Sequence, residues 1–288
     1  NASVSIGNKQ ALLEAVYKNY ADSDTPLRTK LDEAGKYFEC VSGNIFGLTA
    51  GSTSCPILEA ASGGACQKNF TVLMTDGYYN DTFTFGTTPY NKDGGTSDSS
   101  FDGGAYKDAW EHTLADVAMH YYERDLSALP NDVFPVPGVD TATHQHMVTY
   151  GVAFGVTGTL TANPPNATSP FAWPNPALGD AQKIDDLRHA AYNGRGKFLS
   201  AKSPLELRDS LGSALGHITG LLGSASSVAV NSHILSTTTT IYQARFTSGE
   251  WSGDLRALPV STSGAIGSEL WSASTQLKAQ NWNTGRRI

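Results

Sequence analysis

Asp76 could place a carboxylate at the rim of a sheet, because it follows a short apolar run of β-prone residues. The run covers residues 69–75 (NFTVLMT), and Gly77 comes directly after the acid. In open α/β sheets, ligands bind beyond the carboxyl ends of the strands, so an acid at such an end is a candidate metal or substrate ligand. An Asp-Gly turn with a solvated carboxylate is the alternative interpretation of this segment taken alone.

Thr25 stands just before a helical pattern. We predict that Thr25 is the N-cap of this helix and that Pro26 takes the first helical position. Thr25 then lies in a loop at the mouth of a helix. The apolar face of the predicted helix consists of Leu27, Leu31, Ala34 and Phe38.

Two other groups of residues have metal-ligand chemistry but unsuitable spacing. His144 and His146 alternate at the start of an apolar strand, yet no third ligand stands near them, so we interpret them as polar residues at a strand entrance. Asp93, Asp98 and Asp102 lie in a Gly- and Ser-rich loop. Their spacing misses the calcium loop of EF-hands, and its terminal Glu is absent, so we predict a mobile loop instead.

The three cysteines, Cys40, Cys55 and Cys66, lie close together in a Gly-, Ser- and Ala-rich segment. They form no Cys-x-x-Cys pair and have no histidine at zinc-site spacing, so we predict no zinc site among them. We expect at least one disulfide, with one thiol left over. The sequence does not select the pair, and the odd cysteine could bond to chain outside these residues.

Composition narrows the class of protein. Of the 288 residues, 40% are hydrophobic, which is ample for a core, and the formal net charge is −7. No block of Lys or Arg exceeds two residues, which argues against a nucleic-acid partner. Only 16% of the residues are charged, while Gly, Ser, Thr and Asn are abundant, a profile typical of exported proteins. No apolar run reaches the roughly 18 residues of a spanning helix, so we expect no transmembrane segment.

The pattern that must position these residues alternates amphipathic helices with short apolar strands. It predicts a doubly wound α/β layer around a mostly parallel sheet, with Thr25 and Asp76 at the same edge. The expected strands cover residues 70–75, 146–156 and 197–201. The expected helices cover residues 8–20, 25–38, 113–126, 184–192 and 203–222. The last helix opens with a capping box from Ser203 to Glu206. Its predicted apolar face consists of Leu207, Leu211, Leu215, Ile218 and Leu222.

From residue 226 onwards the pattern changes to apolar and polar alternation broken by Ser-Gly and Gly-Asp turns. The apolar positions include Val228, Val230, Ile241 and Leu255. Alternation of this kind predicts β-sheet. We therefore divide the chain into an α/β domain over residues 1–225 and a β-rich segment over residues 226–288.

Several segments, taken together and in order, resemble the PilY/PilC-type tip adhesins of type IV pili. They are Thr25-Pro26-Leu27-Arg28, Cys66-Gln67-Lys68-Asn69-Phe70, Asp76-Gly77-Tyr78, Leu114-Ala115-Asp116-Val117-Ala118-Met119, Gln145-His146-Met147-Val148, Asn193-Gly194-Arg195-Gly196, Tyr242-Gln243-Ala244-Arg245-Phe246 and Trp251-Ser252-Gly253-Asp254-Leu255. In that family a von Willebrand factor A-like domain precedes a C-terminal β-propeller. The resemblance implies that residues 1–225 are the later part of the A-like domain, incomplete at its N-terminal side. It also implies that residues 226–288 begin a truncated β-propeller.

The resemblance further implies a metal-ion-dependent adhesion site at the carboxyl edge of the sheet. Thr25 and Asp76 match two of its parts by position and context. The third part, Asp-x-Ser-x-Ser, is imitated in letters by Asn1-Ala2-Ser3-Val4-Ser5, but Asn replaces the acid and no apolar strand precedes it. We expect that motif upstream of these residues. The implied cation is Mg²⁺, with Ca²⁺ or Mn²⁺ as alternatives, held weakly or not at all by two ligands.

The function that the resemblance implies is non-enzymatic: adhesion and pilus assembly at the tip of a type IV pilus. Its partners would be minor pilins and a host or abiotic surface, and the protein would pass through the periplasm to the cell surface. The alternative is a secreted, metal-assisted hydrolase that uses Asp76, Asp81, His144 or His146. The sequence contains no GxSxG, HExxH or phosphate-binding glycine loop that would support an enzyme.

Overall fold

The computed structural model describes residues 24–52, 54–94, 100–222, 228–230, 239–247, 252–261 and 267–280, together with residues 10, 13, 14, 17 and 18. Those five residues near the N-terminus are helical, as the pattern over residues 8–20 predicts. The Asn1-Ala2-Ser3-Val4-Ser5 segment, Asp98 and Trp251 lie outside the described residues.

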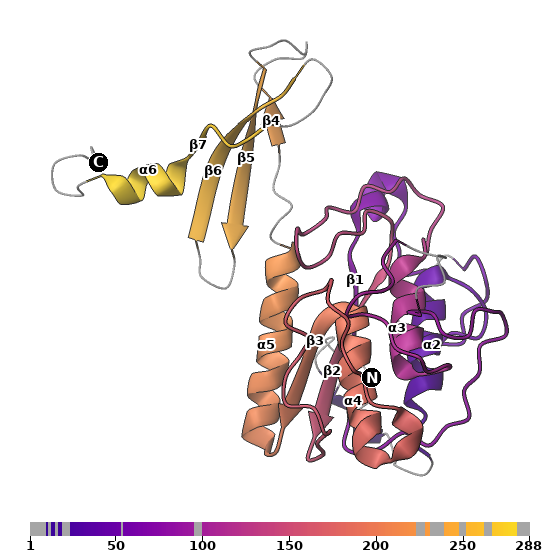
Figure 1. Cartoon of the computed structure of the whole chain (residues 1–288). Helices are drawn as coiled ribbons and strands as arrows, with labels where there is room; N and C mark the ends of the chain where they lie inside the picture. The colour runs from indigo at the N-terminus through magenta and orange to yellow at the C-terminus, as the bar shows by residue number, and fades with distance from the viewer. Residues whose placement is uncertain are drawn as a thin grey trace, which may run out of the picture.

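The first sheet is parallel and has the strand order β1-β2-β3 within the described part of the chain (Figure 1). Its strands are β1 (Asn69–Thr75), β2 (Met147–Phe154) and β3 (Arg195–Ala201). Phe70 pairs with Val148 and Thr75 with Ala153, so β1 and β2 are direct neighbours in the mostly parallel sheet that the sequence predicts. The central strand β2 is buried along nearly its whole length, because helices cover both of its faces.

Among the described residues, helices cover both faces of this sheet, α2, α3 and α4 on one face and α5 on the other (Figure 1). Helices α2 (Leu27–Glu39), α3 (Leu114–Glu123) and α4 (Asp180–Asn193) pack on the face that carries Leu73, Met147 and Ala153. Helix α5 (Pro204–Leu222) packs on the face that carries Val148 and Tyr150. The predicted α/β architecture, with helices on both faces of a parallel sheet, is therefore present.

The apolar face predicted for α5 is wrong at Leu215. That side chain is 60% exposed, whereas Ala214 and Leu221 are buried. Ala214 and Ile218 contact the sheet, and the small Ala214 side chain suits close approach of the helix to Val148 and Tyr150. The predicted capping box is half present. Ser203 Oγ accepts from the N–H of Glu206 at 3.3 Å, but the Glu206 carboxylate reaches the N–H of Lys202 instead.

Long connections join these elements and contain short 3₁₀ turns. These turns are η1 (Ala60–Ser62), η2 (Gly64–Cys66) and η3 (Pro176–Leu178). Helix α3 begins at a capping box in which the Thr113 hydroxyl and the Asp116 carboxylate each accept the other's backbone N–H. The capping box defines the start of α3, the first regular element after the long connection from β1.

The second sheet is antiparallel, with the order β4-β5-β6-β7 in the described residues. Its strands are β4 (Val228–Val230), β5 (Thr240–Thr247), β6 (Ser252–Pro259) and β7 (Trp271–Ser272). A short helix, α6 (Ala273–Ala279), follows and was not predicted. It begins where Ser272 Oγ accepts from the N–H of Thr275, an N-cap at the end of a β-pattern. The β-pattern from residue 226 therefore corresponds to a real antiparallel sheet.

Candidate binding site at the carboxyl edge of the sheet

Thr25 is tied to the loop that follows β1. The side chain of Asn80 accepts from the backbone N–H of Thr25 at 2.8 Å, and the backbone N–H of Asn80 donates to the carbonyl of Thr25 at 3.2 Å. Asp76 stands at the start of that loop, directly after β1, and is exposed. Both residues therefore belong to the carboxyl edge of the sheet, as the parallel topology requires.

The cap of α2 differs from the prediction. Pro26, not Thr25, occupies the N-cap position, and no side chain caps the helix there. The backbone of Thr25 forms hydrogen bonds with Asn80. The first turn of α2 is instead bound by the side chain of Asp81, which is distant in the sequence. One Asp81 oxygen accepts from the N–H of Thr29 at 2.9 Å and from its hydroxyl at 2.8 Å. The other accepts from Arg28 Nε at 3.2 Å.

The side-chain oxygens of Thr25 and Asp76 are not used by the fold. Neither the Thr25 hydroxyl nor the Asp76 carboxylate makes a hydrogen bond or ion pair with any residue that the structure describes. A buried or structural acid is normally paired, as Asp81 is. Two unpaired oxygen groups at one edge suit an external ligand, and this donor chemistry is the kind that a hard cation takes.

A pocket of about 710 Å³ opens beside this edge. Its lining comes from four parts of the chain: Arg28, Tyr79–Asp81, Ala109–Thr113, and Asn175–Ala177 with Lys183. The Arg28 guanidinium and the Lys183 ammonium lie 4.7 and 5.7 Å from the centre of the Tyr79 ring. Burial and the carboxylate of Asp186, which accepts from the Tyr79 hydroxyl at 2.6 Å, raise the pKa of Tyr79 far above its usual value. The pocket therefore contains the aromatic ring of Tyr79 with the positively charged side chains of Arg28 and Lys183 beside it.

The two histidines considered as metal ligands lie at the opposite, amino edge. His146 contacts the Asp140 carboxylate at 3.2 Å through Nε2 and the carbonyl of His144 at 2.7 Å through Nδ1. His144 Nε2 lies 2.8 Å from the carbonyl of Tyr122, and burial lowers the pKa of His144. Asp76 is at the other end of the sheet, so the residues named for a hydrolase do not meet in one place.

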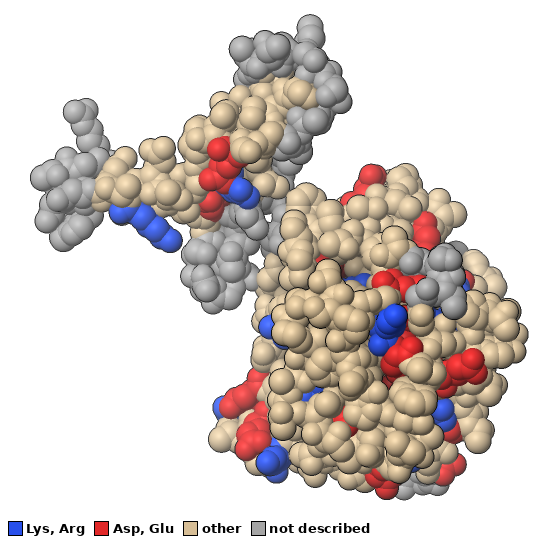
Figure 2. All heavy atoms as spheres, in the orientation of Figure 1, with Lys and Arg blue, Asp and Glu red and all other residues tan. Residues whose placement is uncertain are grey.

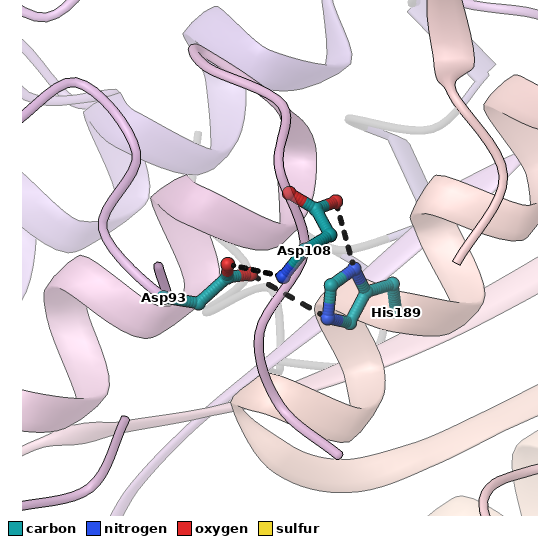
Figure 3. Close-up of side chains that lie close together, drawn as sticks. All are labelled: Asp93, Asp108 and His189. Atoms are coloured by element: carbon teal, nitrogen blue, oxygen red, sulfur yellow. Dashed lines mark hydrogen bonds and ion pairs between the residues drawn. The ribbon is translucent and has the colours of Figure 1, made fainter. Parts of the chain in front are cut away.

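A cluster that sequence reasoning missed joins Asp93, Asp108 and His189 (Figure 3). His189 Nε2 lies 2.6 Å from the carbonyl of Tyr106 and 3.5 Å from Asp93 Oδ2, and Nδ1 lies 3.5 Å from Asp108 Oδ2. Burial raises the pKa of Asp93 to about 7, despite the opposing charge of His189. Burial would lower the pKa of His189, but its hydrogen bond to Asp108 and the two carboxylate charges raise it overall. Asp108 and His189 stand in no recognisable motif, so only the fold brings them to Asp93.

The cysteines pair as Cys40–Cys55, with Cα atoms 5.4 Å apart, and Cys66 is a free, exposed thiol. The prediction of at least one disulfide is confirmed. On the face drawn in Figure 2, Lys and Arg side chains are scattered among Asp and Glu side chains and form no large basic patch. Among the described residues, no helix is both long and apolar enough to cross a membrane.

Three named proteins match nearly the whole chain. The type IV pilus biogenesis factor PilY1 of Pseudomonas aeruginosa strain PAK is 31% identical over 308 aligned positions, which cover 92% of this chain and 26% of that protein. The PilY1 of strain PAO1 is 32% identical over 306 positions, with the same coverage. The PilY1 of strain UCBPP-PA14 is 30% identical over 302 positions. This chain is a relative of PilY1.

The resemblance read from the sequence motifs is thereby confirmed at the level of the family. The chain spans about a quarter of the length of these PilY1 relatives. No protein-family model matches it, and no solved structure matches it. The parallel sheet is therefore established by the strand pairing in this chain's own structure. The role of PilY1 in pilus biogenesis is extended to this chain only as a proposal.

Proposed function

We propose that this chain is an exported, non-enzymatic module of a type IV pilus tip protein, active in adhesion and in pilus assembly. The observation that carries the proposal is the match to PilY1, named as a pilus biogenesis factor, over 92% of the chain. Minor pilins at the pilus tip and a host or abiotic surface are the partners of such a module. The acidic chain, with its interspersed charges, agrees with a protein or surface partner.

The α/β part is, in this proposal, a von Willebrand factor A-like domain that a further strand completes. β1 pairs only with β2 among the described residues, so its other edge is free for a strand. On the face that carries Phe70, Val72 is 39% and Met74 is 53% exposed. An apolar strand ending in Asp-x-Ser-x-Ser would pair at this edge and bring its acid and serines towards Asp76. The second sheet would begin a β-propeller over residues 226–288.

Thr25 and Asp76 are the proposed ligands of the adhesion-site cation. Mg²⁺ suits this oxygen chemistry, while Ca²⁺ and Mn²⁺ are the alternatives. One neutral hydroxyl and one carboxylate hold Mg²⁺ poorly, because the ion gives up its water reluctantly. The cation would supply an open coordination position for a carboxylate of the partner. Thr25 and Asp76 would supply two oxygen ligands at the edge of the sheet. Both side chains are available for this role, because they make no hydrogen bonds with described residues.

The test uses the full-length protein in its own bacterium. Asp76→Ala is compared with Asp132→Ala, which removes an exposed acid at the other end of the sheet. We expect Asp76→Ala to lower Mg²⁺-dependent attachment to cells or plastic at least tenfold while surface pili still form. Asp132→Ala should attach like the wild type. Equal attachment by both variants would refute the metal-dependent adhesion site, and normal piliation and attachment after deletion of the whole module would refute the pilus role.

A further inference from the structure

We propose that Asp93, Asp108 and His189 form a second, buried metal site, which takes a transition-metal ion such as Zn²⁺ or Mn²⁺. The three side chains offer ligand atoms that all lie within 4.8 Å of one another (Figure 3). They come from two loop positions between β1 and α3 and from α4. The site is separate from Thr25 and Asp76 and does not depend on the proposed adhesion function.

The ring of His189 is held in the way that a metal-bound histidine is held. Its Nε2 donates to the carbonyl of Tyr106 at 2.6 Å, so Nδ1, which lies 3.5 Å from Asp108 Oδ2, is the nitrogen that would bind a metal ion in place of its proton. A histidine ligand almost always gives its other N–H to a carbonyl or carboxylate, which orients the ring. Trp173 fixes the plane further by stacking on the imidazole at 4.0 Å and 10°.

The two carboxylates are oriented by neighbouring groups as well. Asp93 accepts from the backbone N–H of Asp108 at 2.9 Å and from the amide of Asn193 at 2.7 Å. Asp108 accepts from the N–H of Trp110 at 2.7 Å, so its other oxygen faces His189. Ligands of a tetrahedral ion with bonds of about 2.1 Å lie about 3.4 Å from each other. The 3.5 Å between His189 Nδ1 and Asp108 Oδ2 already matches that spacing.

Asn193, at the end of helix α4, supports the cluster through its side-chain amide. It is fully buried, and its Nδ2 donates to Asp93 Oδ2 at 2.7 Å and to the carbonyl of Ala115 at 3.3 Å. Both partners are acceptors, which fixes the amide with its nitrogen towards Asp93. The site therefore offers three protein ligands, and Asn193 orients one of them.

Charge and ligand type select the class of ion. Two carboxylates and a neutral imidazole carry a formal charge of −2, which a divalent cation balances inside the protein. The imidazole ligand favours Zn²⁺ or Fe²⁺ over Mg²⁺ and Ca²⁺, and the two carboxylates also suit Mn²⁺. Ala109 and Trp110 follow Asp108 and line the 710 Å³ pocket, so the cluster lies next to one wall of that pocket. A bound metal ion would link the loop that carries Asp108 to helix α4, which carries His189.

The experiment measures Zn²⁺ and Mn²⁺ binding to the purified 288-residue chain. Every protein carries Cys66→Ser, so that the exposed thiol does not bind zinc, and is first freed of metal with a chelator. We expect one ion per chain and a higher melting temperature with Zn²⁺, since a ligand that binds only the folded state stabilises it. Asp108→Asn and His189→Gln should each weaken binding at least tenfold. Asp76→Ala and His217→Gln, a histidine on α5, should bind like the parent.

Two results of the binding measurements would overturn the proposal. One is the absence of stoichiometric Zn²⁺ or Mn²⁺ binding, which would leave the cluster as a charged histidine between two aspartates. The other is binding that Asp108→Asn does not weaken. If His189→Gln fails to fold, ¹⁵N spectra of the parent decide the matter without it. Zinc should remove the proton from His189 Nδ1, and a ring that stays protonated at both nitrogens in saturating Zn²⁺ refutes the site.

Discussion

Asp140 at the amino edge of the parallel sheet and Asp76 at its carboxyl edge have opposite environments. At the amino edge, Asp140 is fully buried and is contacted by Lys68 at 2.9 Å, by His146 at 3.2 Å and by the Tyr122 hydroxyl at 3.1 Å. At the carboxyl edge, Asp76 is exposed and has no partner among the described residues. A buried carboxylate that stabilises the fold is normally hydrogen-bonded or ion-paired within the protein itself. An acid left without a partner at the ligand-binding end of the strands is therefore the better functional candidate.

Gly196 and Gly77 show a similar contrast. A Cβ on Gly196, at the start of β3, would lie 2.1 Å from the backbone oxygen of Thr149. A Cβ on Gly77, directly after Asp76, would meet nothing within 4 Å. The chain is closely packed around Gly196, while there is free space beside Gly77. Substitutions at these positions test how far each environment contributes to the stability of the fold.

The largest effect is expected from Asp140→Asn. The substitution leaves Lys68 and His146 buried without a charged partner, and removal of one member of a buried pair costs about 3–5 kcal/mol. Urea unfolding of the purified chain measures the free energy. Asp125→Asn, an exposed acid after α3, serves as the control and should change it by less than about 0.5 kcal/mol. Equal stabilities would mean that the Asp140 network contributes nothing to the fold.

The stabilisation by Asp140 should also depend on pH. Burial opposes ionisation of Asp140, but the hydrogen bonds and charges of His146 and Lys68 outweigh it, so its pKa lies well below the usual value. A lowered folded pKa gives stability that is present above the unfolded pKa of about 3.9 and is lost as pH falls through the folded pKa. The difference between wild type and Asp140→Asn should thus be full at neutral pH and shrink below about pH 4. A constant difference down to pH 2, measured by urea unfolding, would contradict this.

Gly196→Ala should rank next, because the new methyl group meets backbone that cannot rotate away. Overpacking of this kind typically costs about 1–3 kcal/mol. Gly77→Ala should stay within about 0.5 kcal/mol of the wild type, since its site is open. Thermal unfolding of both variants, side by side, measures the contrast. Similar losses in the two variants would show that the carboxyl edge is as tightly packed as the amino edge.

Asp76→Ala should have the smallest effect on this chain. An exposed acid without partners contributes under about 0.5 kcal/mol, and two ligands hold Mg²⁺ poorly. We therefore expect almost no change in melting temperature with millimolar Mg²⁺, in wild type or variant. A stabilisation of about 1.4 kcal/mol would need free metal near ten times Kd. A large Mg²⁺ shift that Asp76→Ala abolishes would show that nearby oxygens, such as Asp24 or Asn80, complete the coordination.

Local sequence pattern was enough for much of the fold. Apolar runs over residues 69–75 and 147–154, separated by amphipathic helices, predicted parallel neighbouring strands, and the structure has them in register. Parallel strands share one carboxyl edge, so the common location of Thr25 and Asp76 followed from topology. The disulfide was expected from composition. Each of these results depends on residue type and short-range periodicity, which the sequence displays directly.

Other features depended on contacts that periodicity does not encode. Three of these features depend on which surfaces approach one another in the folded chain. They are the Cys40–Cys55 pairing, the exposure of Leu215 to solvent and the position of Pro26 as the N-cap of α2. The cluster of Asp93, Asp108 and His189 is the clearest case, because its members stand far apart in the chain and belong to no motif. The sequence by itself determined the strands, the helices and the edge that carries Asp76. Only the tertiary structure decided which distant polar groups would be buried together, because burial makes each of them require a partner.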